Sequence, residues 1–204
     1  MPRQVDHEGR RRQIAEAVCR LADERGLEAV TLRDVAARAQ VSMGAVQRCF
    51  RTKEEMLVFA LGAVGERVTA RVRARLVASP AQSAASALGH AVTEVSLLGE
   101  EHRAEARVWL AFVAQAAVSE ALAGTLKANY AALHEAFVRL IAEADESAGH
   151  VEPLDAQHEA RVLLALADGL TAHVLVGHLT ARQAQDVLHT HVGRLWQRPT
   201  VTPG

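Results

Sequence analysis

The fold is decided by residues 26–57, GLEAVTLRDVAARAQVSMGAVQRCFRTKEEML. Thr31 and Asp34 have the spacing of a capping box, which predicts a short helix that begins just after Thr31. Ser42 is a suitable N-cap for a second short helix, Met43 to Phe50. Two short helices joined by a turn of this kind form a helix-turn-helix, here over residues 31–50.

The segments on either side of this motif complete a three-helix unit. Residues 10–26 carry Ile14, Val18 and Leu21 on one face, and Gly26 stands where a left-handed residue commonly ends a helix. A second capping pattern at Thr52 opens a long helix over residues 52–78. Residues 1–9 are polar, and we expect them to fray.

A helix-turn-helix suits double-stranded DNA, because its second helix fits the major groove and its N-terminal residues meet the base edges. Glutamine can pair with adenine, arginine can pair with guanine, and small residues let the backbone approach. The candidate DNA-contacting residues are Thr31, Arg33, Ser42, Met43, Gly44, Gln47, Arg48 and Lys53. Composition alone leaves open a helical hairpin with solvated charges.

The charge of the chain is unevenly distributed. Residues 1–53 contain 11 Lys and Arg against 7 Asp and Glu, whereas the other residues contain 12 against 17, for a net charge of −1. A basic N-terminal unit on an acidic body suggests a module that faces a polyanion, although ordinary surface scatter would give the same numbers.

The N-terminal stretch, over about residues 8–68, resembles the DNA-binding domain of TetR-family transcriptional regulators. The matching positions are Gly26, Thr31, Val35-Ala36, Val41-Ser42, Gly44, Phe50, Lys53, Glu54 and Met56-Leu57. The resemblance implies a homodimer that binds a pseudo-palindromic operator, with half-sites about 34–36 Å apart. The family usually has Tyr where Gln47 stands and often His where Cys49 stands, so base preference is expected to differ.

Residues 69–198 are expected to form an all-α ligand-binding and dimerisation domain, which makes about nine helices in the whole chain. The expected spans are 80–98, 100–118, 119–144, 155–178 and 180–196, the first opened by Ser79-Pro80 and the last by a Thr180/Gln183 capping box. The stretch from Trp109 to Asp168-Gly169-Leu170 resembles the betaine-regulatory repressors. The resemblance implies that the last two helices dimerise through a four-helix bundle. Their apolar faces carry Leu163, Leu166, Leu170, Val174, Leu188, Val192 and Leu195.

A ligand pocket is usually apolar with a few convergent polar groups, so polar residues on apolar faces are candidates for effector contact. Gln115, His134 and His173 are such residues. Trp109, Phe112, Tyr130 and Phe137 could form the walls of the pocket, and all seven residues are also compatible with an ordinary core. No acidic residue stands out on these faces, so the sequence does not argue for a cationic effector.

The sequence contains few features of enzymes, metalloproteins, or membrane or secreted proteins. The chain has no Glu-x-x-His pair, Walker loop or Gly-x-Ser-x-Gly, and the pairs His189/His191 and His173/His178 are spaced to diverge on a helix. We therefore expect no catalysis, no cofactor and no metal. No apolar run reaches the ~18 residues of a membrane span, no secretory leader is recognisable, and Cys19 and Cys49 fit a reducing compartment. These features predict a soluble, cytoplasmic protein without a membrane partner.

The sequence thus predicts a homodimeric repressor that a small-molecule effector releases from its operator. An activator or dual regulator on the same scaffold is one alternative. A helical small-molecule binder whose DNA binding has lapsed is another, and only the departures at Gln47 and Cys49 support it.

Overall fold

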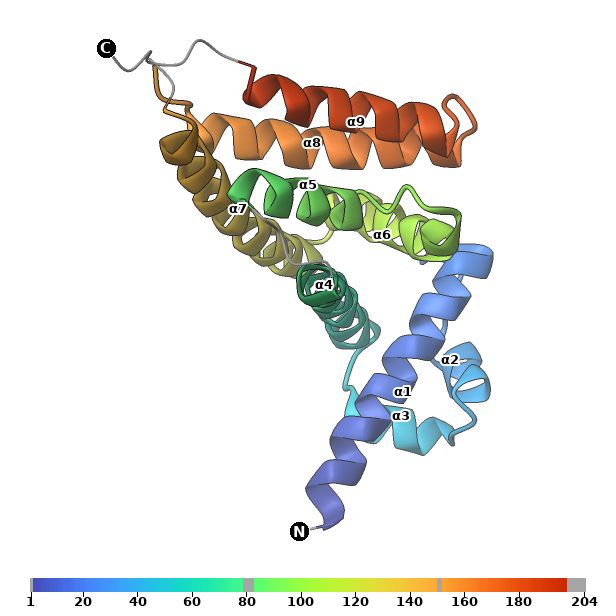
Figure 1. Cartoon of the computed structure of the whole chain (residues 1–204). Coiled ribbons are helices and arrows are strands. Elements are labelled where there is room, and N and C mark those ends of the chain that lie inside the picture. Colours follow the sequence, from blue (N-terminus) through green and yellow to red (C-terminus); the bar gives the residue numbers. More distant parts are fainter. Residues whose placement is uncertain (1, 79–82, 150–151, 198–204) are drawn as a thin grey trace, which may run out of the picture. The chain divides into compact units, whose positions relative to one another are not determined.

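The computed structural model describes residues 2–78, 83–149 and 152–197, and every regular element in these ranges is a helix (Figure 1). The predicted all-α class is therefore confirmed. The described helices are α1 (Pro2–Arg25), α2 (Leu32–Arg38), α3 (Met43–Cys49), α4 (Lys53–Ala78), α5 (Ala84–Val95), the 3-10 helix η1 (Glu100–His102), α6 (Arg103–Ala116), α7 (Glu120–Ala148), α8 (Ala156–Leu175) and α9 (Ala181–Leu195).

The chain forms two compact units, and each is discontinuous in sequence. Unit 1 consists of Met1–Arg67 and Ala104–Asn129, and unit 2 consists of Val68–Arg103 and Tyr130–Gly204. Nearly all of α6 and the start of α7 therefore belong to the same compact unit as the helix-turn-helix.

The helix-turn-helix of unit 1 is built as its caps predict. The Thr31 hydroxyl accepts a hydrogen bond from the Asp34 amide at 3.1 Å, and the Ser42 hydroxyl accepts one from the Ala45 amide at 3.2 Å. In the turn between them, Gln40 takes a left-handed conformation with φ 54°. Helix α3 ends at Cys49, so Phe50 is its C-cap rather than its last residue.

Helix α1 buries the predicted apolar stripe of Ile14, Val18 and Leu21, but it begins at Pro2 rather than near residue 10. Residues 2–9 are mostly polar and have no apolar period, so the pattern that located the rest of the helix is missing there. The predicted helix start near residue 10 is therefore wrong, and Met1 lies outside the described residues.

Polar contacts join α6 and α7 to the other helices of unit 1. Arg107 of α6 forms an ion pair with Asp23 of α1, with Nε 2.6 Å from the carboxylate. Ser119, just before α7, donates a hydrogen bond to Glu54 of α4 at 3.1 Å. These contacts connect α6 to α1, and the residue before α7 to the beginning of α4.

Arg67 of α4 adds a further link inside unit 1. Its guanidinium lies 3.8 Å from the Glu105 carboxylate and 3.7 Å from the Cys19 sulfur. Burial raises the pKa of the Cys19 thiol, and the neighbouring Arg67 opposes this shift only in part. Cys19 is therefore a packed thiol and not an activated one.

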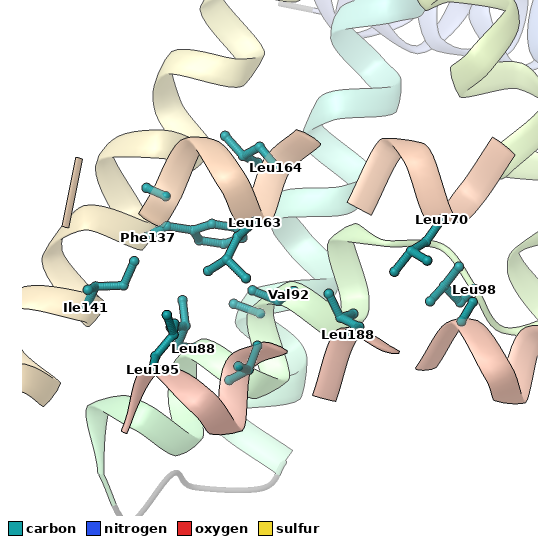
Figure 2. Packing of buried hydrophobic residues seen from close by; sticks show 14 residues of the cluster. Leu88, Val92, Leu98, Phe137, Ile141, Leu163, Leu164, Leu170, Leu188 and Leu195 are labelled. Atoms are coloured by element: carbon teal, nitrogen blue, oxygen red, sulfur yellow. The ribbon is translucent and has the colours of Figure 1, made fainter. Parts of the chain in front are cut away.

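Unit 2 has its own hydrophobic core, to which α5, α7, α8 and α9 all contribute (Figure 2). Helices α8 and α9 run side by side, and α5 packs against both (Figure 1). The predicted Thr180/Gln183 capping box is present at the start of α9. The labelled core residues are Leu88, Val92, Leu98, Phe137, Ile141, Leu163, Leu164, Leu170, Leu188 and Leu195.

The connection after α5 differs from the prediction, because α5 ends at Val95 rather than near Leu98. Leu97 is buried in a left-handed conformation with φ 49°, which a leucine rarely adopts. The Thr171 hydroxyl of α8 donates to the Ser96 carbonyl at 2.5 Å and braces this turn. The predicted helix start at Ser79-Pro80 lies outside the described residues, and the described helix is capped by Ser83.

Candidate DNA-binding surface and effector region

Helix α3 divides cleanly into a buried and an exposed side. Ala45, Val46 and Cys49 are buried against the rest of unit 1. Met43, with 40% of its surface exposed, and the exposed Gln47 and Arg48 lie on the other side. The side chains predicted to meet base edges therefore project from the protein.

The Arg48 guanidinium lies against Gly44 at the start of α3. A Cβ atom at this position would stand 3.5 Å from Nη1 of Arg48, so the guanidinium lies beside the first turn of the helix. Because base edges are met from the N-terminal end of such a helix, Arg48 is placed where it could reach a guanine.

Two further cations flank α3 in the chain. Arg33, at the second position of α2, is exposed. Lys53, the first residue of α4, is half-buried, and its Nζ donates to the Glu28 carbonyl at 3.3 Å. Thr31 and Ser42 are exposed but use their hydroxyls as helix caps. These four predicted DNA-contacting residues are thus at least partly accessible to solvent. Thr31, Ser42 and Lys53 also form hydrogen bonds within the protein.

The two departures from the family pattern have different surroundings. Gln47 is exposed, whereas Cys49 is buried with 6% of its surface accessible. A change at Gln47 alters the exposed side of α3, while a change at Cys49 alters how α3 packs. The predicted difference in base preference therefore depends on Gln47 and not on Cys49.

Arg11 of α1 braces α3 in a way that sequence reasoning missed. Its guanidinium carbon lies 4.8 Å from the centre of the Phe50 ring and 4.4 Å from that of Phe59, and the two rings are 5.5 Å apart. A cation stacked on two rings stabilises the end of α3 against α1 and α4. Arg11 stands in the run Arg10-Arg11-Arg12, so nothing in the sequence distinguishes it from its neighbours.

Polar contacts hold α2 against α1. The Gln13 side chain donates to the Ala39 carbonyl at 2.8 Å, and Arg38 makes two 2.6 Å hydrogen bonds to Glu24. The hydrogen bonds from Arg38 hold the pKa of the Glu24 carboxyl below its usual range.

The seven predicted effector residues fall into both units. Trp109 and Phe112 are buried in unit 1 with the half-buried Gln115 beside them on α6. The other four belong to unit 2 and have different surroundings: they are Tyr130, His134, Phe137 and His173.

In unit 2, Phe137 is part of the core and the half-buried His134 ring pairs with the Gln157 carbonyl at 3.2 Å. The half-buried Tyr130 donates its hydroxyl hydrogen bond to Asp168 of α8. Burial and this hydrogen bond raise the pKa of the Tyr130 phenol. The sequence pointed to no acidic group on these faces, whereas the structure places the Asp168 carboxylate against Tyr130. His173, expected on an apolar face, is exposed.

A cleft of about 560 Å³ opens in unit 2 between the second half of α4, α5 and α7. Of the seven predicted effector residues, Phe137 is the one that lines it. Its walls are largely aliphatic, and arginine and glutamate side chains stand among them. The lining includes Val72, Arg73, Leu76, Leu133, Glu135, Arg139, Leu140 and Glu143.

The residues predicted for dimerisation mostly pack within a single chain. Five of them are buried in the core of unit 2: Leu163, Leu170, Leu188, Val192 and Leu195. Leu166 and Val174 keep part of their surface accessible. Periodicity located the apolar side of α8 and α9, but it did not distinguish the side that faces the core from a side that faces a partner.

Neither a metal site with three or more ligands nor a membrane span occurs among the described residues. No three His, Cys, Asp or Glu side chains gather there in a way that could hold a metal ion. No helix in those ranges combines the length and apolar character that a membrane crossing requires.

Two family models match the chain. The model for bacterial regulatory proteins of the tetR family matches residues 14–58, and that for the C-terminal part of BetI-type transcriptional repressors matches residues 84–197. The first contains the helix-turn-helix, and the second covers most of the helical body.

Several known proteins are similar to this chain. The HTH-type transcriptional regulator PksA of Bacillus subtilis is 36% identical over 178 residues, which are 86% of this chain and 83% of PksA. The HTH-type transcriptional repressor KstR of Mycolicibacterium smegmatis is 44% identical over 62 residues, 30% of each protein.

Solved structures share the fold. A transcriptional regulator from Rhodococcus sp. Rha1 has a TM-score of 0.81 and 30% identity, over 95% of this chain and 99% of that one. A transcriptional regulator from Saccharomonospora viridis, solved in complex with choline, has a TM-score of 0.79 and 24% identity, over 90% and 95% of the two chains.

Proposed function

Since the chain belongs to the TetR family of DNA-binding transcriptional regulators, we propose that it is a homodimeric repressor that a small-molecule effector releases from a pseudo-palindromic operator. The exposed side of α3 carries this proposal, because Gln47 and Arg48 project from a helix that is capped at Ser42, braced by Arg11 and buried along its other side. Arg33 and Lys53 supply positive charge on the neighbouring helices, where phosphates can be bound.

Selection of binding sites from a random pool of double-stranded DNA tests the proposal most directly. We expect enrichment of a two-fold symmetric sequence, with half-sites about one helical turn, or 34–36 Å, apart. A matched variant with Arg48→Ala should enrich less and lose discrimination at one position of each half-site. If the parent protein enriches no sequence, the alternative of a helical small-molecule binder with lapsed DNA binding is favoured.

Gln47 is proposed to set base preference rather than overall affinity. Replacing it by Ala should change the bases enriched at one position, at a cost of about 1–3 kcal/mol for the favoured base. The salt dependence of binding should stay the same, because no phosphate contact is removed. Identical enriched sequences for Gln47→Ala and the parent would contradict this role.

The outer surface of α8 and α9 supports dimerisation. Leu166 of α8 and Val187 of α9 line a shallow depression of about 410 Å³, together with the polar Thr190 and Arg194. Val187 has 46% of its surface exposed and lies beside the partly buried Leu166, so the depression has an apolar part. We propose that this depression receives the same surface of a second copy.

The effector is proposed to bind in the helical body. The cleft between α4, α5 and α7 offers an apolar surface with charged side chains at hand, and Tyr130 and Asp168 form a second polar feature of unit 2. Trp109, Phe112 and Gln115 belong to unit 1 and form a separate candidate set, to be tested independently of the cleft. Choline, bound by the Saccharomonospora viridis regulator, is the first compound to test. Release of a fluorescent operator as the compound is added would identify an effector.

An activator or dual regulator would use the same DNA-binding surface. Transcription from a promoter that carries the selected site, measured with and without the protein, separates these cases. Repression predicts less transcript with the protein, and recovery when the effector is added.

A further inference from the structure

The end of α8 brings together two histidines that the sequence separates. His173 lies in the last turn of α8, and His178 follows three residues after the end of the helix at Leu175. On a continuous helix, residues five apart would point about 140° apart around the axis. In the structure, the centres of the two imidazole rings are 4.9 Å apart and their planes are inclined by 54°.

The backbone explains this approach. Gly177 adopts a left-handed conformation with φ 75°, which ends the helix and reverses the chain. The amides of His178 and Leu179 then both donate to the His173 carbonyl, at 2.9 and 3.2 Å. The backbone of His178 is therefore fastened directly to the backbone of His173, and the two rings start from a fixed separation.

This separation, which is also that of an ordinary ring contact, falls in the range that lets two imidazoles share a metal ion. With a metal–nitrogen bond of about 2.0–2.1 Å and a ring radius of about 1.2 Å, each ring centre lies about 3.2 Å from the ion. At nitrogen–metal–nitrogen angles from about 90° to 109°, the two centres would be about 4.5–5.2 Å apart. We propose that His173 and His178 form a two-histidine binding site for a divalent first-row transition ion.

The surroundings indicate which ions the site takes. Both side chains are exposed, so water can complete the coordination. In the described residues no third His, Cys, Asp or Glu joins them, and a site of imidazole alone selects Cu²⁺, Ni²⁺ or Zn²⁺ over Mg²⁺ and Ca²⁺, which prefer oxygen ligands. The carbonyl end of α8 carries partial negative charge, which favours a bound cation. Cu²⁺ should bind most tightly of the three.

Titration calorimetry of the full chain with CuCl₂, NiCl₂, ZnCl₂ and MgCl₂ tests the proposal. We expect one Cu²⁺ per chain and no binding of Mg²⁺. His173→Ala and His178→Ala should each weaken Cu²⁺ binding at least tenfold, whereas His158→Ala, an exposed histidine near the start of the same helix, should leave it unchanged. Electron paramagnetic resonance of the Cu²⁺ complex should show two nitrogen donors, and one fewer in each single variant.

A variant that keeps both histidines tests the geometry. Gly177→Ala has space for its Cβ atom but disfavours the left-handed conformation that returns His178 to His173. It should weaken Cu²⁺ binding while circular dichroism shows unchanged helix content. Cu²⁺ affinity that survives in either histidine variant, or that is the same in Gly177→Ala and the parent, would overturn the proposal. This site does not depend on the proposed repressor function, because metal binding is measured without DNA.

Discussion

At the scale of single residues, Lys53 is predicted to contact a phosphate. Lys53→Ala should weaken binding to specific and random DNA alike, and should make the slope of log affinity against log salt less steep by about 0.9. Fluorescence anisotropy over a series of salt concentrations measures both. Lys127→Ala removes the other lysine of the chain and is the matched control. An unchanged slope for Lys53→Ala would show that its ammonium group serves only the Glu28 carbonyl.

Arg11 is predicted to position α3 without touching DNA. Arg11→Met keeps the length of the side chain but removes the charge stacked on Phe50 and Phe59, which should cost about 0.5–2 kcal/mol of unfolding free energy. Operator affinity should fall, while the salt slope stays that of the parent. Arg11→Lys should restore part of both losses. A flatter salt slope in Arg11→Met would instead indicate a phosphate contact.

Residue-scale features were the hardest to predict from sequence. Thr31 and Ser42 were found because a cap depends on residues only three positions away. Arg11, by contrast, gains its role from two rings that lie 39 and 48 positions further along the chain. Asp168 lies beside a candidate effector residue only because Tyr130, on another helix, donates a hydrogen bond to its carboxylate. Contacts of this kind have no local pattern.

At the scale of elements, the connection between α5 and α6 is braced by the buried hydroxyl of Thr171. Thr171→Val keeps the shape of the side chain but leaves the Ser96 carbonyl without its donor, which should cost about 1–3 kcal/mol of unfolding free energy. Thr125→Val, at a partly exposed site on α7, should cost less than about 0.5 kcal/mol. Urea unfolding of the two variants measures the difference. Equal losses would mean that the bond to Ser96 does not hold this turn.

The helices themselves were largely predictable, and their ends show why. Where a cap residue stands at the boundary, as at Ser42 and Thr180, the predicted and observed starts agree. Where the sequence is mostly polar, as in residues 2–9, the start was missed. The turn at Gly177 was treated as a continuation of the helix, so His173 and His178 were expected to diverge.

At the scale of the whole molecule, self-association should depend on the outer side of α8 and α9. Val187→Glu places a charge in the depression lined by Leu166 and Arg194, and should convert the proposed dimer to a monomer at micromolar concentration. Sedimentation velocity of the parent and the variant measures the change. Val118→Glu, at a valine of unit 1 with 81% of its surface exposed, should leave the proposed dimer intact. A Val187→Glu protein that remains dimeric would place the interface elsewhere.

The sequence predicted two successive domains, meeting near residue 68, and that functional division stays a prediction. The compact units are not successive, because α6 and the start of α7 fold with the helix-turn-helix. Contacts such as Arg107 with Asp23, 84 positions apart, create this arrangement. Composition and helix caps are local features of the sequence, so they do not predict which distant segments pack together.

The two sides of α3 also have a consequence for how such a protein can change over generations. Substitutions at exposed positions usually alter stability by less than about 0.5 kcal/mol, so Gln47 can be replaced without endangering the fold. Cys49 and Val46 are tied to packing, and changes there are penalised whatever DNA is bound. A duplicated copy of the gene could therefore acquire a new target sequence in single mutational steps, each through a folded protein.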